Sequence, residues 1–177
     1  MKLERKTKET TIVVEMAQGS GAASVNSGTP FLDHMLTALA RYSGLDITVS
    51  ADGDLAHHVI EDIAITMGTA FARILPEKCS RYGDRTVAMD DALVHVVVDT
   101  GGRAYYRGPI PGNLYDHWMR SFSQNAGMTL HIRVLRGKDR HHIVEAAFKA
   151  FGLALRDALR EGDAVFSTKG SVSVREV

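Results

Sequence analysis

One five-residue pattern occurs twice in this chain, first as His57-His58-Val59-Ile60-Glu61 and again as His141-His142-Ile143-Val144-Glu145. The sequence holds only 8 His in 177 residues, so two copies of His-His-x-x-Glu would rarely arise by chance. The first residues of the two copies are 84 positions apart. A repeat at this distance predicts that the chain is an internal duplication of two equivalent halves.

An apolar stripe at helical spacing follows each copy, and both segments are rich in strong helix formers. On a helix, residues three or four apart share a face, whereas adjacent residues diverge by about 100°. Each Glu can therefore share an ion with either His of its copy, but two adjacent His chelate one ion poorly. We expect each His pair to serve two ions, one His to each. Imidazole nitrogens with one carboxylate suit Mn, Fe or Zn and do not suit Ca or Mg.

A second repeated pair, Asp33-His34 and Asp116-His117, adds two candidate ligands. The first copy lies on a helix predicted for residues 30–42 and the second on a helix predicted for residues 115–125, and the two His are 83 positions apart. With them the inventory is six His and two Glu, which divides into two ions with three His and one Glu each. An octahedral ion then keeps two open positions, as a catalytic site requires.

The order helix, strand, turn, His-His helix occurs in both halves. We therefore predict an α+β fold in which each half, about residues 1–85 and 86–177 of a single domain, is a small, mostly antiparallel sheet with two helices packed on one face. Residues 77–83 are predicted to be a polar loop. Strands are predicted at residues 10–16, 22–26, 45–51, 86–89, 93–99, 103–106 and 128–135.

Composition excludes several classes of protein. A net charge of zero and a pI near 7.1 argue against general binding to nucleic acid or membrane surfaces. The chain has no apolar run long enough to cross a bilayer, and residues 1–6 lack the apolar core of a signal peptide. Cys79 is the single cysteine, so no intrachain disulfide forms, and a cytoplasmic location is expected.

Several basic residues are candidates for binding an anionic substrate. Lys149 lies four residues after Glu145 and shares its helix face, whereas the matching residue of the first half is Ile65. A cation beside only one ligand set suggests that an anionic group of the substrate lies there. An ordinary solvated surface position remains the alternative for each candidate. The other candidates are hydroxyl or basic residues close to glycines: Arg81, Arg103, Ser167, Thr168 and Lys169.

Taken together, these features resemble the imidazoleglycerol-phosphate dehydratase family of histidine biosynthesis. The resemblance covers nearly the whole chain. Tyr42 departs from the pattern, because family members usually have His there, and the stretch before His57 is shorter than usual. The matching stretches include both His-His motifs and residues 5–10, 31–36, 81–83, 89–93, 102–103, 128–132, 141–150 and 167–170.

The resemblance implies a dinuclear site with two Mn²⁺ per active site, Fe²⁺ or Zn²⁺ being alternatives. It also implies trimers that assemble into a 24-subunit shell, with active sites at the subunit contacts. One ion would take His34, His58, His141 and Glu145, and the other would take His57, Glu61, His117 and His142. The implied substrate contacts are Glu9, Tyr42, Arg81, Arg103, Lys149, Ser167 and Lys169.

The expected reaction is loss of water from imidazole glycerol phosphate to give imidazole acetol phosphate, with Glu9 transferring a proton to or from the glycerol carbon. Two other functions compete with this hypothesis. A two-metal hydrolase would use a bridging hydroxide on a phosphoester or amide, and an assay with the substrate distinguishes it. A non-catalytic metal-binding shell protein would leave no open coordination position.

Overall fold

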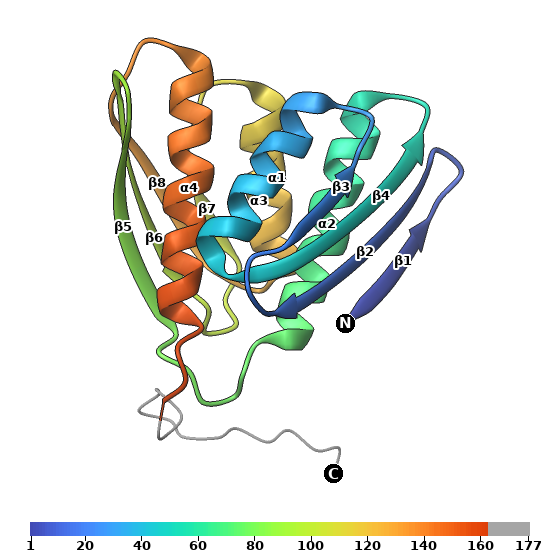
Figure 1. Ribbon diagram of the computed structural model, residues 1–177, viewed down its shortest axis with the longest axis horizontal. Helices are drawn as coiled ribbons and strands as arrows, with labels where there is room; N and C mark the ends of the chain where they lie inside the picture. The colour runs from blue at the N-terminus through green and yellow to red at the C-terminus, as the bar shows by residue number, and fades with distance from the viewer. Residues whose placement is uncertain (163–177) are drawn as a thin grey trace.

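Four helices lie between two β-sheets in the computed structural model, which describes residues 1–162 (Figure 1). The first half comprises β1 (Lys2–Lys6), β2 (Thr10–Gln18), β3 (Ala23–Asn26), α1 (Pro30–Ser43), β4 (Leu45–Gly53) and α2 (Ala56–Ile74). The second half comprises β5 (Tyr82–Met89), β6 (Ala92–Asp99), β7 (Tyr105–Arg107), α3 (Asn113–Asn125), β8 (Thr129–Arg136) and α4 (Arg140–Ala158).

The two sheets have the same topology. Their strand orders are β1-β2-β4-β3 and β5-β6-β8-β7, which become identical when four is added to each strand number of the first sheet. The last pair in each sheet, β3 with β4 and β7 with β8, is parallel, and the other pairs are antiparallel. The predicted duplication and the predicted α+β class are therefore confirmed.

Alternating residues of the central strands build the core. Ile12, Val14 and Met16 of β2 and the even-numbered valines of β6, residues 94–98, are buried, while their neighbours in sequence face outward. Helices α1 and α2 cover the first sheet, and α3 and α4 cover the second. The halves join where α1 packs on α4 and α2 packs on α3.

Two equivalent glycines allow these helix pairs to approach closely. Gly68 on α2 and Gly152 on α4 each lie seven residues after the Glu of their motif. A Cβ at Gly68 would come within 2.5 Å of the Phe122 carbonyl oxygen on α3. A Cβ at Gly152 would come within 3.1 Å of the Leu39 carbonyl oxygen on α1. Both positions therefore admit only a hydrogen where the backbones meet.

Three local details differ from the predictions. Strand β1 was not predicted, because its residues are mostly charged, as is common at a sheet edge. Strand β5 begins at Tyr82, four residues before the predicted start at residue 86, so the predicted division of the halves falls inside it. Thr29 precedes α1 as expected, but its side chain makes no capping hydrogen bond.

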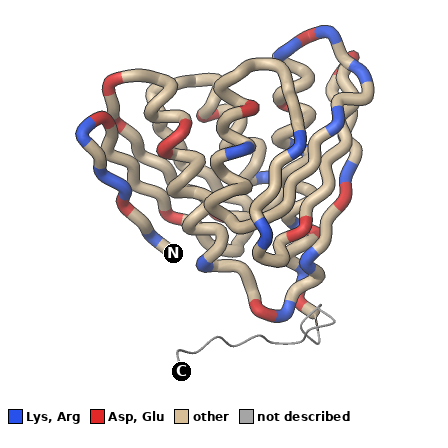
Figure 2. Tube along the Cα trace, turned by 180° about the vertical axis from the view of Figure 1, so that it is seen from behind, with Lys and Arg blue, Asp and Glu red and all other residues tan. Residues whose placement is uncertain are grey.

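Basic and acidic residues are interspersed along the described chain, as the coloured trace in Figure 2 shows. This distribution accords with the balanced charge of the sequence. Among residues 1–162, no helix is both long enough and apolar enough to cross a membrane.

Candidate metal centre

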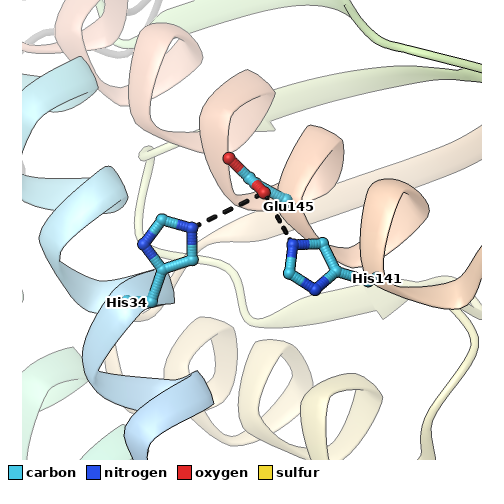
Figure 3. Close-up of side chains that lie close together, drawn as sticks. All are labelled: His34, His141 and Glu145. Carbon is cyan, nitrogen blue, oxygen red and sulfur yellow. Dashed lines mark hydrogen bonds and ion pairs between the residues drawn. The ribbon is translucent and has the colours of Figure 1, made fainter.

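The first ligand group joins α1 and α4 (Figure 3). Glu145 Oε2 lies 3.1 Å from His141 Nε2 and 3.5 Å from His34 Nε2. The Glu145 side chain is only 7% exposed, whereas both His rings are open to solvent. A buried carboxylate with two imidazole nitrogens converging on one oxygen presents three donors to a single point.

The second group joins α2 and α3 in the same way. Glu61 Oε2 lies 3.6 Å from His57 Nε2, and Glu61 Oε1 lies 3.1 Å from His117 Nε2. The His117 nitrogen is buried, yet its direction towards the carboxylate does not make a hydrogen bond. A buried nitrogen that lies beside a carboxylate and has no hydrogen bond suits metal coordination.

Helix pairing between the halves creates both groups. Each His-His-x-x-Glu motif begins in the first turn of its helix, α2 or α4, and each partner His comes from the helix of the other half that packs there. Six of the eight predicted ligands are thus brought together, with the donor atoms of each group within 4.8 Å of one another. Two imidazoles and a carboxylate per group fit Mn, Fe or Zn.

The Asp that precedes each partner His fixes the start of its helix. Asp33 accepts a hydrogen bond from the Ser27 backbone N–H at 2.9 Å. Asp116 accepts one from the Ile110 N–H at 3.0 Å, again six residues earlier. These equivalent bonds hold the loops that lead into α1 and α3, and they place the following His on the face that meets the partner helix.

His58 and His142, the other two predicted ligands, stand apart from both groups. His58 Nδ1 lies 2.8 Å from Asp54, and His142 Nδ1 lies 2.8 Å from Asp91. These hydrogen bonds are the main reason why the pKa of each His is raised above its ordinary value. His142, with help from the backbone N–H groups of Lys138 and Asp139, lowers the pKa of Asp91 to about 2.

Lys149 lies beside the first group, as its spacing from Glu145 predicted. Its Nζ is 2.8 Å from Glu145 Oε1 and 5.7 Å from the centre of the Tyr42 ring. Burial opposes ionisation of Glu145, but the hydrogen bond and the charge of Lys149 outweigh it and lower the pKa of this carboxyl. Lys149 and Tyr42 therefore border the first ligand group on the side of Glu145 Oε1.

Glu9 lies near the other His pair, a proximity that spacing alone did not predict. Its Oε2 is 3.7 Å from His58 Nδ1, and its side chain is 57% exposed. This places the predicted proton-transfer residue next to a predicted ligand, although 49 positions separate the two in sequence.

The predicted arginines lie elsewhere in the chain. Arg81 pairs with Asp99 at 2.6 Å, and Arg103 contributes to lowering the pKa of the same carboxyl, after Arg81 itself. Asp99 lies at the end of β6, whereas Asp91, which contacts the predicted ligand His142, lies just before the start of this strand. The length of the strand, roughly 25 Å, therefore separates Asp99 from His142 and its partner. Within one chain neither Arg reaches the ligand groups, and their contact with substrate stays a prediction. Ser167 and Lys169 lie outside the described residues.

Comparison with known proteins identifies the family. A family model described as imidazoleglycerol-phosphate dehydratase matches residues 27–155, which include all eight predicted ligands. The chain belongs to the imidazoleglycerol-phosphate dehydratase family. The resemblance noted from the motifs, and with it the predicted enzyme class, a hydro-lyase, are confirmed.

Relatives of the same name span nearly the whole chain. The imidazoleglycerol-phosphate dehydratase of Kineococcus radiotolerans is 42% identical, over 97% of this chain and 98% of its own. Imidazoleglycerol-phosphate dehydratase 1, chloroplastic, of Arabidopsis thaliana is 44% identical over 97% of this chain and 71% of its own.

Solved structures of the family share the fold. The Pyrococcus furiosus structure superposes with a TM-score of 0.86 at 41% identity, covering 96% of this chain and all of the other. The Staphylococcus aureus structure gives 0.80 at 34% identity and covers 91% and 99%. The duplicated architecture is therefore that of the family.

Proposed function

We propose that this chain is a metal-dependent dehydratase that converts imidazole glycerol phosphate into imidazole acetol phosphate and water in histidine biosynthesis. The observation that carries the proposal is the pair of equivalent donor groups, His34 with His141 and Glu145, and His57 with Glu61 and His117. Membership of a family named for this activity supports the choice of substrate.

The two groups would hold two ions, Mn²⁺ in our proposal, with Fe²⁺ or Zn²⁺ as alternatives. Bound metal would withdraw electrons from the imidazole ring of the substrate and so stabilise the negative charge that develops during loss of water. The buried Glu145 and the half-buried Glu61 supply the anionic ligand of each group and keep the His rings turned towards it.

Other side chains would bind the substrate and move its protons. The Lys149 ammonium, beside the first group, would contact the phosphate through charge-assisted hydrogen bonds. The exposed Glu9 carboxylate lies beside His58. From this position it would transfer a proton to or from the glycerol carbon while the hydroxyl group leaves as water.

A second copy of the chain would complete each site. His58 and His142 lie outside the donor groups of their own chain, and Arg81 and Arg103 lie a strand length away from His142. We propose that neighbouring copies exchange these residues within the trimers and the 24-subunit shell that the family resemblance implies. The lone Cys79, buried as a free thiol, fits a reducing cytoplasm.

An assay of the metal-reconstituted protein with imidazole glycerol phosphate tests the proposal. Protein reconstituted with Mn²⁺ should form imidazole acetol phosphate, and chelated protein should not. A Glu61→Gln variant keeps the shape of the second group and removes its charge, so it should bind less Mn²⁺ and form less product than the parent. Release of inorganic phosphate without the acetol product would indicate the rival hydrolase, and metal binding without either product would indicate a non-catalytic shell.

A further inference from the structure

The second His of each motif is held by a carboxylate in the same way. Asp54 Oδ1 lies 2.8 Å from His58 Nδ1, and Asp91 Oδ1 lies 2.8 Å from His142 Nδ1. Asp54 lies on the loop between β4 and α2, and Asp91 lies on the turn between β5 and β6. The two carboxylates come from different segments, so the duplication did not simply copy the contact.

The hydrogen bond determines which ring nitrogen is available. An ionised carboxylate only accepts hydrogen bonds, so the ring nitrogen facing it must carry the proton. Both hydrogen bonds therefore favour the tautomer with Nδ1–H and an unprotonated Nε2. His142 Nε2 also lies 3.3 Å from the exposed Asp90 carboxylate, but only the contact of Nδ1 with Asp91 is a hydrogen bond. In metal sites, a carboxylate behind a His commonly fixes its tautomer and orientation in this way and makes the nitrogen that ligates more basic.

We infer that Asp54 and Asp91 are positioning residues that present His58 Nε2 and His142 Nε2 as metal ligands. The inference rests on the proposed metal function, and it concerns the two ligands that stand apart from the donor groups. Asp91 also accepts the backbone N–H groups of Lys138 and Asp139 at 2.6 and 3.2 Å, so it ties the turn before α4 to the His it orients.

The two halves differ in the contact between the acidic residue before the second strand and the second His of the motif. Glu9 precedes β2 as Asp91 precedes the equivalent strand β6, yet Asp91 binds its His and Glu9 does not. Glu9 Oε2 stays 3.7 Å from His58 Nδ1, because Asp54 takes the hydrogen bond. Asp54 thus leaves Glu9 available for proton transfer.

The first test reads the tautomers directly. Ring ¹⁵N shifts of His-labelled, metal-free protein, recorded at a pH where the rings are neutral, should show Nδ1–H and a bare Nε2 for His58 and His142. Asp54→Ala and Asp91→Ala should each shift only their own His towards the Nε2–H form. The opposite tautomer in the parent protein would overturn the inference, whether or not the protein proves to be metal-dependent.

The second test measures Mn²⁺ affinity by calorimetry. Asp54→Ala should weaken binding about 10–100-fold, the usual cost of losing such a partner. Asp54→Asn keeps a hydrogen-bond acceptor and should recover part of the lost Mn²⁺ affinity. Asp91→Asn tests the second His in the same way, and it should disturb the turn before α4 less than Asp91→Ala does. Asp52→Asn is the matched control, since it removes an exposed carboxylate two residues away that forms no hydrogen bond or ion pair with a His among residues 1–162.

Asp54→Ala binding Mn²⁺ as tightly as Asp52→Asn would also overturn the inference. Failure of the parent protein to bind Mn²⁺ would instead count against the proposed function, and the tautomers would still decide the role of Asp54 and Asp91. Thermal melting of the metal-free variants separates loss of orientation from loss of fold.

Discussion

At the scale of single residues, the two motif glutamates have different surroundings. Glu145 is 7% exposed and paired with Lys149, whereas Glu61 is 35% exposed and has Ile65 at the matching place. Lys149 therefore brings a positive charge to the first group at the place where the second group has Ile65. The two ligand groups therefore have the same donor atoms but different electrostatic surroundings. We expect the phosphate of an anionic substrate to bind on the Lys149 side.

We expect Lys149→Ala to weaken binding of imidazole glycerol phosphate by about 1.5–3 kcal/mol, because a charge-assisted hydrogen bond to phosphate is lost. Binding is measured by calorimetry on Mn²⁺-loaded protein, together with metal content, which should stay at the parent value. Lys138→Ala removes an exposed Lys from the turn before α4 and is the control. Equal affinity in the two variants would remove Lys149 from phosphate binding.

Glu9→Gln should keep the fold, the metal content and the substrate affinity, while turnover falls about 10²–10⁴-fold, the usual contribution of a positioned acid–base group. The amide keeps the shape of the side chain but cannot exchange the proton. Steady-state kinetics and metal analysis of the same preparation give the answer. Turnover within a few-fold of the parent would show that Glu9 does not carry the proton.

The Asp–His contacts predict how stability depends on pH. Hydrogen bonding to Asp54 and Asp91 raises the pKa of His58 and His142, so this stabilisation is fully present below the unfolded value, about 6.5, and is lost as pH rises through the raised pKa. Metal-free protein should therefore melt at lower temperature as pH increases across this window.

Mn²⁺ should reverse that slope, because metal binds the neutral ring and gains affinity as pH rises. Melting curves with chelator and with Mn²⁺ provide the comparison. The doubly substituted Asp54→Asn and Asp91→Asn protein is the control and should lose most of the metal-free slope. A metal-free slope of the opposite sign would contradict the prediction.

At the scale of elements, the helix pairs place the ligands. Gly152 lies where α4 packs closely on α1, and Gly68 lies where α2 packs closely on α3, so neither helix backbone is held off by a side chain there. Each glycine lies two helical turns beyond the Glu of its motif, on the same face. The close approach of the paired helices at the glycines therefore also brings the donor atoms of the two helices together.

Gly68→Ala should destabilise the protein by about 1–3 kcal/mol, since its Cβ would lie 2.5 Å from the Phe122 carbonyl oxygen and the backbone must move. Gly152→Ala should cost less, because its shortest new contacts, 2.9 Å to Tyr42 Cβ and 3.1 Å to the Leu39 carbonyl oxygen, are longer than the 2.5 Å contact at Gly68. Denaturant unfolding of both variants tests the order. Ordinary helix propensity alone would make each variant about 1 kcal/mol more stable, so that gain would refute the packing argument.

At the scale of the whole molecule, one chain presents two groups of three donors and two further His held by carboxylates outside them. Six donors are supplied by contacts between the halves, and the remaining two are offered at the surface. In the proposed assembly, metal bound between copies would add its binding free energy to that of the subunit contacts.

Removal of metal should therefore dissociate the assembly. Chelator at mildly acidic pH, where protonation of the His also opposes metal binding, should convert a large particle into smaller species in sedimentation velocity. Added Mn²⁺ at neutral pH should restore it, and Mg²⁺, which prefers oxygen ligands, serves as the control. A large particle that survives with no bound metal would contradict the prediction.

The local features of this protein could be predicted from its sequence alone. The repeat of His57 and His141 with their glutamates, the helical stripe behind each copy and the repeated Asp-His pair were sufficient to predict two equivalent halves and all six grouped donors. Helical periodicity and residue chemistry are short-range properties, so they can be read within a window of a few turns.

Only the tertiary structure decided which helix meets which, and where the remaining residues lie. The pairing of α1 with α4, the approach of Glu9 to His58 and the distance of Arg81 from the ligand groups depend on contacts between residues far apart in sequence. Asp54 and Asp91 were not predicted as partners of His, because single carboxylates in turns are common and carry no periodic signal. Their contacts with His arise only on folding, which brings each Oδ1 within 2.8 Å of an imidazole.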